Sequence, residues 1–167
     1  MKRGLFLGTF QPYMHQHRAV LEQIAQNVEE LIVGITGAQI SHELYAPFTA
    51  GERVQMVSAD LRDFETPVYV LPIEDIKRSP LLVSHIVSLV PEFSVVYSAD
   101  SLVRRLFREA GYIVNSPDID DSTLQEIWCR LALDSENWDE LIPESTKAVI
   151  RGHDGISRMK KIAETDY

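Results

Sequence analysis

The sequence has little cysteine, no long apolar run and few positive charges. Its single cysteine, Cys129, excludes an intrachain disulfide and a zinc site built from several thiolates. No apolar run reaches the roughly 20 residues that a membrane-spanning helix needs. The N-terminus also lacks an apolar segment followed by a small-residue cleavage site. We therefore expect neither a membrane protein nor a signal peptide, and the cytoplasm is the default compartment.

The charge balance is acidic, with 16 Lys and Arg against 25 Asp and Glu and a formal net charge of −9. Nucleic-acid-binding proteins usually need a basic face, so nucleic acid is not an expected partner. An acidic protein can still bind a small anionic substrate, because local arginines and backbone N–H groups hold phosphate.

Apolar strand-like runs alternate with helical patterns over the first two thirds of the chain. This order predicts a doubly wound α/β fold, with a five-stranded parallel sheet covered by helices on both faces. Ligands of such sheets bind at the carboxyl ends of the strands, near a topological switch point. The predicted strands are 4–8, 31–36, 67–71, 94–98 and 112–115, and the predicted helices are 17–27, 50–64, 80–90 and 101–109.

The last third of the chain is predicted to be helical, over 122–133, 142–150 and 156–163. Ser122 or Thr123 would cap the first of these helices. Pro143 would open the second, because proline suits the first helical turn. We expect one domain over 1–167, with a core at 1–118 and a small C-terminal helical appendage at 119–167.

The segment after the first predicted strand has the features of a phosphate-binding turn. Gly8 and Pro12 interrupt the apolar run, and a helical pattern follows. Such a turn can present backbone N–H groups beside the positive end of a helix dipole. His15 and His17 lie at this turn, and the alternative is an ordinary strand–turn–helix connection with two surface histidines.

The segment after the second predicted strand combines small and polar residues. Gly37 and Ala38 permit a ligand to approach the backbone closely. Gln39, Ser41 and His42 supply hydrogen-bonding groups. The alternative interpretation is a polar loop.

A capping box opens the helix that follows, because Thr49 is a good N-cap and Glu52 lies three residues later. Arg53 then falls in the first turn, where a cation opposes the helix dipole. We therefore expect Arg53 to contact a phosphate or a carboxylate.

Acidic residues follow the third and fourth predicted strands. Glu74 and Asp75 could bind ribose hydroxyls, an amide or a metal, or could form a solvated turn. Asp100 or Ser101 would cap the helix after the fourth strand.

Together these segments resemble the archaeal-type nicotinamide-mononucleotide adenylyltransferases, which belong to the HxGH nucleotidyltransferase superfamily. The resemblance covers about residues 2–163, with the elements in the same order. Its most specific part is GAQISH at 37–42 followed by PFTAGER at 47–53. The family has GSAQ-x-SH and NPFTAGER at that spacing.

The resemblance implies a Rossmann-like fold and the transfer of AMP from ATP to nicotinamide mononucleotide, giving NAD and pyrophosphate. It implies Mg2+ bound with ATP, no metal site made by side chains, and a homo-oligomer (a hexamer or a dimer). The implied catalytic residues are His17 and Arg53. The implied ATP or phosphate contacts are Gly8, Thr9, Phe10, Gln11, His15, His42, Ser122 and Thr123, and the implied contacts to the nucleotide substrate are Gly37, Gln39, Ser41, Thr49, Asp75 and Leu82.

The chain departs from the family pattern in the first motif, GRFQPxHxGH. Thr9 replaces the arginine, Met14 stands at the first histidine, and Gln16 replaces the glycine. A methionine cannot donate a hydrogen bond to a phosphate. Leu82 stands where the family places a tryptophan, and leucine offers bulk without a π-face.

A second set of departures adds negative charge. Ala99 and Asp100 replace a Gly-Asn pair, and Asp120 and Asp121 lie where the family's ISGTxIR motif binds triphosphate. Three hypotheses follow. They are an active nicotinamide-nucleotide adenylyltransferase, a divergent paralogue that binds nucleotide or acts structurally, and a transferase for a different nucleotide.

Overall fold

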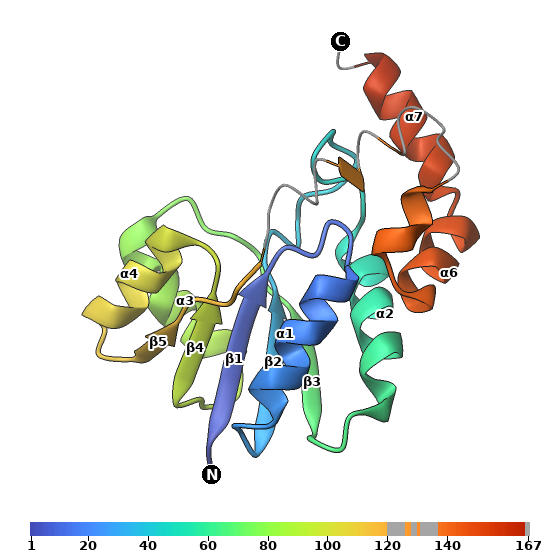
Figure 1. The fold of residues 1–167 in the computed structure, drawn as a ribbon. Coiled ribbons are helices and arrows are strands. Elements are labelled where there is room, and N and C mark those ends of the chain that lie inside the picture. Colours follow the sequence, from blue (N-terminus) through green and yellow to red (C-terminus); the bar gives the residue numbers. More distant parts are fainter. Residues whose placement is uncertain (120–125, 128–129, 131–136, 166–167) are drawn as a thin grey trace.

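The computed structural model describes residues 1–119, 126–127, 130 and 137–165. Its centre is a five-stranded sheet in the order β3-β2-β1-β4-β5, and every neighbouring pair is parallel. The predicted α/β, Rossmann-like sheet is therefore confirmed (Figure 1). The strands are β1 (Arg3–Gly8), β2 (Glu30–Ile35), β3 (Val68–Pro72), β4 (Val95–Ser98) and β5 (Ile113–Asn115).

Helices cover both faces of the sheet because successive strand residues point to opposite sides. Phe6 and Val33 pack in the apolar cluster of α1 (His15–Ala25) and α2 (Ala50–Asp60). Leu5 and Ile32 pack in a second cluster with α3 (Leu82–Leu89) and α4 (Ser101–Glu109). Short 3-10 helices lie at η1 (Leu61–Asp63), η2 (Ser79–Leu81) and η3 (Trp138–Leu141).

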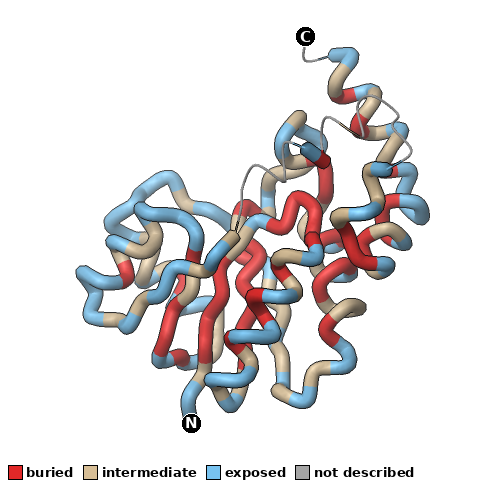
Figure 2. The backbone as a smooth tube through the Cα atoms, in the orientation of Figure 1, coloured by how far each residue is buried: buried red, intermediate tan, exposed pale blue. Residues whose placement is uncertain are grey.

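The C-terminal helices α6 (Glu144–Gly152) and α7 (Gly155–Thr165) lie beyond α2, away from α3 and α4 (Figure 1). Ile150 and Met159 belong to the same buried cluster as Phe10 and Met14. Buried chain therefore continues from the sheet into this end of the molecule (Figure 2). The division into a core and an appendage stays a prediction. Of the predicted helix at 122–133, only residues 126–127 and 130 are described, and these are helical; Ser122, Thr123, Asp120 and Asp121 lie outside the described residues.

Two predicted helix caps are confirmed. The Thr49 Oγ1 atom accepts the N–H of Glu52 at 3.2 Å, and the Glu52 carboxylate accepts the N–H of Thr49 at 2.9 Å. Asp100 caps α4, since its Oδ1 atom accepts the N–H of Val103 at 2.9 Å. The capping pattern was therefore sufficient to locate both helix starts.

Two other helix starts differ from the prediction. Helix α1 begins at His15, two residues early, because the Nδ1 atom of His17 accepts the N–H of Met14 at 2.9 Å. Methionine is not a capping residue, so no capping pattern indicated this start. Pro143 is the extended N-cap of α6 and does not lie in its first turn.

In the described part of the chain, no helix combines the length and apolar character needed to cross a membrane.

Candidate active site at the carboxyl end of the sheet

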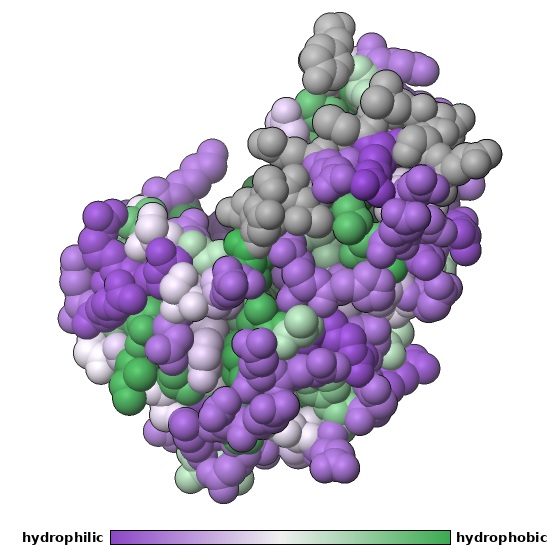
Figure 3. Space-filling model, viewed as in Figure 1, coloured by the Kyte–Doolittle hydropathy of each residue, from purple (hydrophilic) through white to green (hydrophobic). Residues whose placement is uncertain are grey.

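A cleft of about 480 Å³ opens at the carboxyl ends of β1, β2 and β4. The strand order reverses between β1 and β4, so this is the crevice where doubly wound sheets bind ligands. Its volume suits a small molecule. Figure 3 shows the surface hollowed beside the part that carries α3 and α4. The described lining residues are Phe6, Leu7, Gly8, Thr9, His17, Thr36, Asp75, Ile76, Ser79, Leu82, Ile86, Ser98, Ala99, Asp100, Leu102, Val103 and Ile119.

His17 lies in the first turn of α1 and lines the cleft with only 6% of its surface exposed. Its ring stacks on Tyr13 with centroids 5.7 Å apart and meets Phe10 edge-on at 5.0 Å. Burial lowers the pKa of His17 to about 3, so the imidazole is neutral at physiological pH. Since Nδ1 accepts the Met14 N–H, the ring proton lies on Nε2. His17 is therefore a fixed neutral donor at the cleft.

In the turn after β1, some of the predicted phosphate-binding residues lie at the cleft and others lie in the interior. Gly8 and Thr9 line the cleft, whereas Phe10 and Gln11 are buried behind it. Phe10 has φ +52°, a left-handed conformation that costs a side-chain-bearing residue energy and persists only under tight packing. His15 is exposed and is not among the described lining residues.

Gln11 joins this turn to the segment before α2. Its Nε2 atom donates to the carbonyl of Phe48 at 3.0 Å, and its Oε1 atom accepts the N–H of Phe48 at 2.9 Å. Both residues are buried. Two reciprocal hydrogen bonds therefore occupy the amide that the resemblance assigned to phosphate.

Backbone carbonyls occupy the Arg53 guanidinium, whereas its place in the helix predicted a phosphate or carboxylate partner. It is 1% exposed, and burial lowers the pKa of its guanidinium. All five guanidinium N–H donors have backbone carbonyls to bind, because an arginine carries five in a fixed fork. The acceptors are the carbonyl oxygens of Thr9 at 2.9 Å, Thr36 at 2.9 Å, Gly37 at 2.9 Å, Ile40 at 3.4 Å and Thr49 at 3.3 Å.

Gln39 has a similar linking position between the ends of β2 and β3. Its side-chain amide donates to the carbonyl of Asp75 at 3.1 Å and accepts the N–H of Asp75 at 3.0 Å. The Asp75 carboxylate accepts the N–H of Gly37, which has φ +61°, at 3.1 Å. Asp75 itself lines the cleft, whereas Gln39 and Gly37 are not among the described lining residues.

Of the remaining predicted substrate and phosphate contacts that the structure describes, one lines the cleft and three do not. Leu82, at the start of α3, lines the cleft. Ser41 and His42 bond to each other, with Oγ and Nδ1 2.9 Å apart, and His42 has φ +61° and is exposed. Thr49 is occupied as the N-cap of α2. None of these last three is among the described residues that line the cleft.

The described walls of the cleft carry two carboxylates, Asp75 and Asp100, and no lysine or arginine. Within residues 1–119, 126–127, 130 and 137–165, no group of three His, Cys, Asp or Glu side chains could hold a metal ion. A divalent ion would therefore fit here as part of a bound phosphate ligand, with few protein ligands of its own.

Sequence reasoning missed several lining residues. Thr36 directly follows β2 and Ser98 ends β4; the sequence places both at strand ends where ligands bind, but neither was assigned as a site residue. Ser79 and Ile119 gave no such signal, because they lie in connections whose course depends on the tertiary fold.

Comparison with known proteins finds relatives that align with nearly the whole chain. A nicotinamide-nucleotide adenylyltransferase of Methanoculleus marisnigri is 43% identical over 168 residues, covering 99% of this chain and 100% of that relative. The protein of the same name from Halobacterium salinarum is 43% identical over 169 residues, covering 99% and 95%. Among solved structures, a bifunctional NMN adenylyltransferase/ADP ribose pyrophosphatase of Francisella tularensis, complexed with AMP and a Mn ion, has a TM-score of 0.74 at 19% identity. This likeness, over 99% of this chain and 53% of that one, concerns the fold.

The fold and the cleft at its switch point are those of a nucleotidyltransferase, and residues 5–159 match the cytidylyltransferase-like family. The chain belongs to that family. Within it, the full-length relatives described above carry the name nicotinamide-nucleotide adenylyltransferase.

Proposed function

We propose that this protein is a nicotinamide-nucleotide adenylyltransferase, which joins the AMP part of ATP to nicotinamide mononucleotide and releases pyrophosphate. The observation that carries the proposal is the placement of His17, a neutral imidazole held by Met14 at the cleft between β1 and β4. The full-length identity to relatives of that name supports the choice of substrates.

Catalysis follows from positioning and from hydrogen bonding to developing charge. The phosphate of the mononucleotide attacks the α-phosphorus of ATP, and the bond to the pyrophosphate leaving group breaks. The Nε2–H of His17 donates to a phosphate oxygen of ATP, while the backbone of Gly8 and the hydroxyl of Thr9 lie beside it. The described cleft lacks lysine and arginine and so does not offset the triphosphate charge; Mg2+ brought in with ATP would supply that positive charge.

The other assigned residues fall into three roles in this proposal. Asp75 and Leu82 contact the mononucleotide, since both line the cleft. Arg53, Gln11 and Gln39 position the loops, because their polar atoms are occupied by backbone groups. The phosphate roles of Phe10, His15, His42, Ser122 and Thr123, and the substrate roles of Gly37, Ser41 and Thr49, stay predictions.

The test is direct. Purified protein is mixed with ATP, Mg2+ and nicotinamide mononucleotide, and NAD and pyrophosphate are measured. Formation of both products supports the proposal. Absence of both products, together with no rise in Tm on adding ATP, would refute it.

The second candidate is nucleotide binding without transfer. It is favoured by Met14, which occupies the position of the first motif histidine and is 0% exposed. In the same assay, this candidate gives a rise in Tm with ATP but no NAD.

The expected compartment and assembly belong to this proposal. An enzyme that consumes ATP and nicotinamide mononucleotide would act in the cytoplasm. A homo-oligomer, as a hexamer or a dimer, would have an apolar surface available on the η2–α3 side, where Leu81, Val87 and Leu89 are 44%, 41% and 48% exposed. Light scattering of the purified protein measures the number of subunits.

A further inference from the structure

The C-terminal helices contact the segments that shape the cleft at three places. Thr146 of α6 donates a buried hydrogen bond from Oγ1 to the carbonyl of Tyr13 at 2.8 Å. Gly155, which begins α7, is packed so closely that a Cβ atom would lie 3.2 Å from the Phe48 ring. Arg158 of α7 donates from Nη1 to the carbonyl of Pro47 at 3.0 Å. These contacts reach the turn after β1 and the segment before α2.

A fourth link, stronger than these three contacts, joins Arg158 to Glu52. Nη1 donates to Oε2 at 2.7 Å and Nη2 donates to Oε1 at 2.8 Å, so the pair is bidentate. The side chains are only 18% and 8% exposed. Burial opposes ionisation of Glu52, but the hydrogen bonds from Arg158 and the Thr49 N–H, together with the charges of Arg158 and His153, outweigh it and lower the pKa of Glu52. Glu52 is therefore a buried carboxylate whose ionised form is stabilised by Arg158.

Glu52 connects Arg158 to the N-terminus of α2. The Oε2 atom, which accepts from Nη1 of Arg158, also accepts the N–H of Thr49. The next residue, Arg53, donates through its backbone N–H to the carbonyl of Thr49 at 3.1 Å. Its guanidinium then reaches the carbonyls of Thr9 and Thr36, and these two residues line the cleft.

We propose that Arg158 is a positioning residue for the cleft. Through Glu52 it fixes the N-terminus of α2, so that Arg53 keeps the loops after β1 and β2 at the spacing that substrates need. Arg158 is not among the described residues that line the cleft. The activity part of this inference rests on the proposed function, whereas its structural part does not.

Hydrogen exchange tests the structural part in the whole protein. The variants are Arg158→Met, Arg158→Lys and the control Lys161→Met, which removes a positive charge from an exposed position of the same helix. We expect Arg158→Met to speed exchange in α7 and also in peptides covering 9–14, 36–40 and 47–53. Arg158→Lys, which keeps the charge but not the bidentate geometry, should lie between it and the wild type. Faster exchange confined to 153–165 would overturn the proposal.

A double variant keeps the test valid if Arg158→Met fails to fold. Glu52→Gln combined with Arg158→Met removes the unpaired buried carboxylate, and the glutamine oxygen can still accept from Thr49. We expect this protein to fold, as measured by circular dichroism, and still to exchange rapidly at 9–14 and 36–40. Wild-type exchange in those peptides would overturn the proposal.

The rate of NAD formation tests the effect of Arg158 on activity. At a temperature where all variants are folded, we expect kcat of Arg158→Met to fall about 10- to 100-fold, as for other misplacements of order 1 Å, and Lys161→Met to match the wild type. An unchanged kcat despite faster loop exchange would also overturn the positioning role. If the wild type itself makes no NAD, the proposed function fails and the exchange result still decides the role of Arg158.

Discussion

The two sides of the cleft are built from different interactions. On the side of α3 and α4 the wall consists mainly of apolar side chains such as Leu82, Leu102 and Val103, all of them partly exposed. On the other side, here called the linked side, buried Arg53 joins the ends of β1 and β2, and buried Gln11 joins the turn after β1 to the segment before α2. Hydrogen bonds are directional, whereas apolar contacts tolerate changes of shape. In the proposed reaction the linked side therefore holds the reacting groups in place, whereas the shape of the apolar side can adapt to the ligand.

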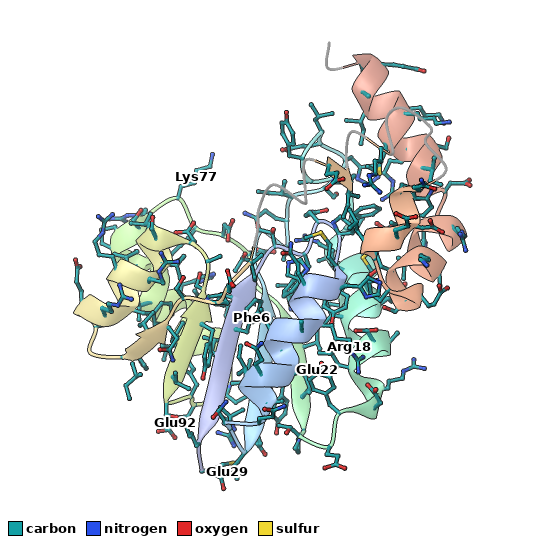
Figure 4. All side chains as sticks on the ribbon, in the orientation of Figure 1. Phe6, Arg18, Glu22, Glu29, Lys77 and Glu92 are labelled. Carbon is teal, nitrogen blue, oxygen red and sulfur yellow. The ribbon has the colours of Figure 1, made fainter. Side chains whose placement is uncertain are left out.

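The two sides also differ in how their charged side chains are arranged (Figure 4). Arg18 and Glu22 lie on α1, behind the linked side, and pair at 2.8 Å with each other; Arg18 also pairs with Asp63 at 2.8 Å. Lys77 projects into solvent from the loop before α3. Arg18, Glu22 and Asp63 are therefore paired charges, whereas Lys77 is an exposed cation at the edge of the apolar side.

The largest expected effect is on catalysis from the linked side. His17→Ala removes the fixed Nε2–H donor, and kcat should fall about 10²- to 10³-fold, equivalent to about 3–4 kcal/mol of transition-state stabilisation. Steady-state production of NAD measures it. His15→Ala is the matched comparison, because His15 is exposed and is not among the described residues that line the cleft; a kcat within about twofold of wild type would remove its predicted phosphate role. Equal losses in both variants would contradict the assignment of His17 as the donor.

The second effect is acid sensitivity, which also comes from the linked side. The folded-state pKa of His17 is about 3, below the unfolded value near 6.5, so the unfolded chain takes up a proton that the folded protein excludes. Stability from this group is present above pH 6.5 and is lost as the pH falls toward 3, by about 1.4 kcal/mol per pH unit, or about 2 kcal/mol at pH 5. Urea unfolding at pH 7.5 and pH 5 measures this loss.

His17→Asn supplies the comparison for the acid effect, since asparagine does not titrate while the carboxylates remain the same. Its free energy of unfolding should fall by about 2 kcal/mol less than that of the wild type over this interval. Identical losses in the two proteins would show that His17 is not excluded from protonation.

Gln39 tests whether the loops at the β2 and β3 ends also need their links. Gln39→Ala removes both hydrogen bonds to the backbone of Asp75, at a cost of about 1–2 kcal/mol. We expect the KM for nicotinamide mononucleotide to rise several-fold while kcat changes little, because Asp75 contacts that substrate in the proposal. Gln55→Ala, at an exposed position of α2, is the control. A fall in kcat alone would place Gln39 in the chemical step.

The smallest effect concerns the apolar side. Leu82→Trp supplies an aromatic face, and aromatic stacking contributes about 0.5–1.5 kcal/mol beyond area burial. The KM for nicotinamide mononucleotide should fall about 2- to 10-fold, and the KM for ATP should not change. Leu81→Trp, one residue earlier, is the control, since Leu81 is 44% exposed and does not line the cleft. A higher KM with Leu82→Trp would mean that the wall is too tightly fitted to accept a larger ring.

Local rules were sufficient for much of the fold. The five strands lie within two residues of their predicted bounds, because each is a short apolar run interrupted by polar or turn residues. The start of α2 was predictable from Thr49 and Glu52, whose capping bonds join residues three apart. The start of α1 was not, because its cap uses a histidine ring whose orientation depends on packing against Tyr13 and Phe10.

The sequence by itself determined the sheet, its crevice and the family resemblance, since all three depend on short-range patterns and on residue order. Only the tertiary structure decided what the polar motif residues do. Gln11 and Phe48 are separated by 37 positions, Arg53 and Thr9 by 44, and Arg158 and Glu52 by 106. A side chain that binds phosphate and one that binds a distant backbone carbonyl can be the same residue type in the same motif. Which partner it binds depends on the three-dimensional path of the chain, because the hydrogen bond forms with whichever group lies within about 3 Å.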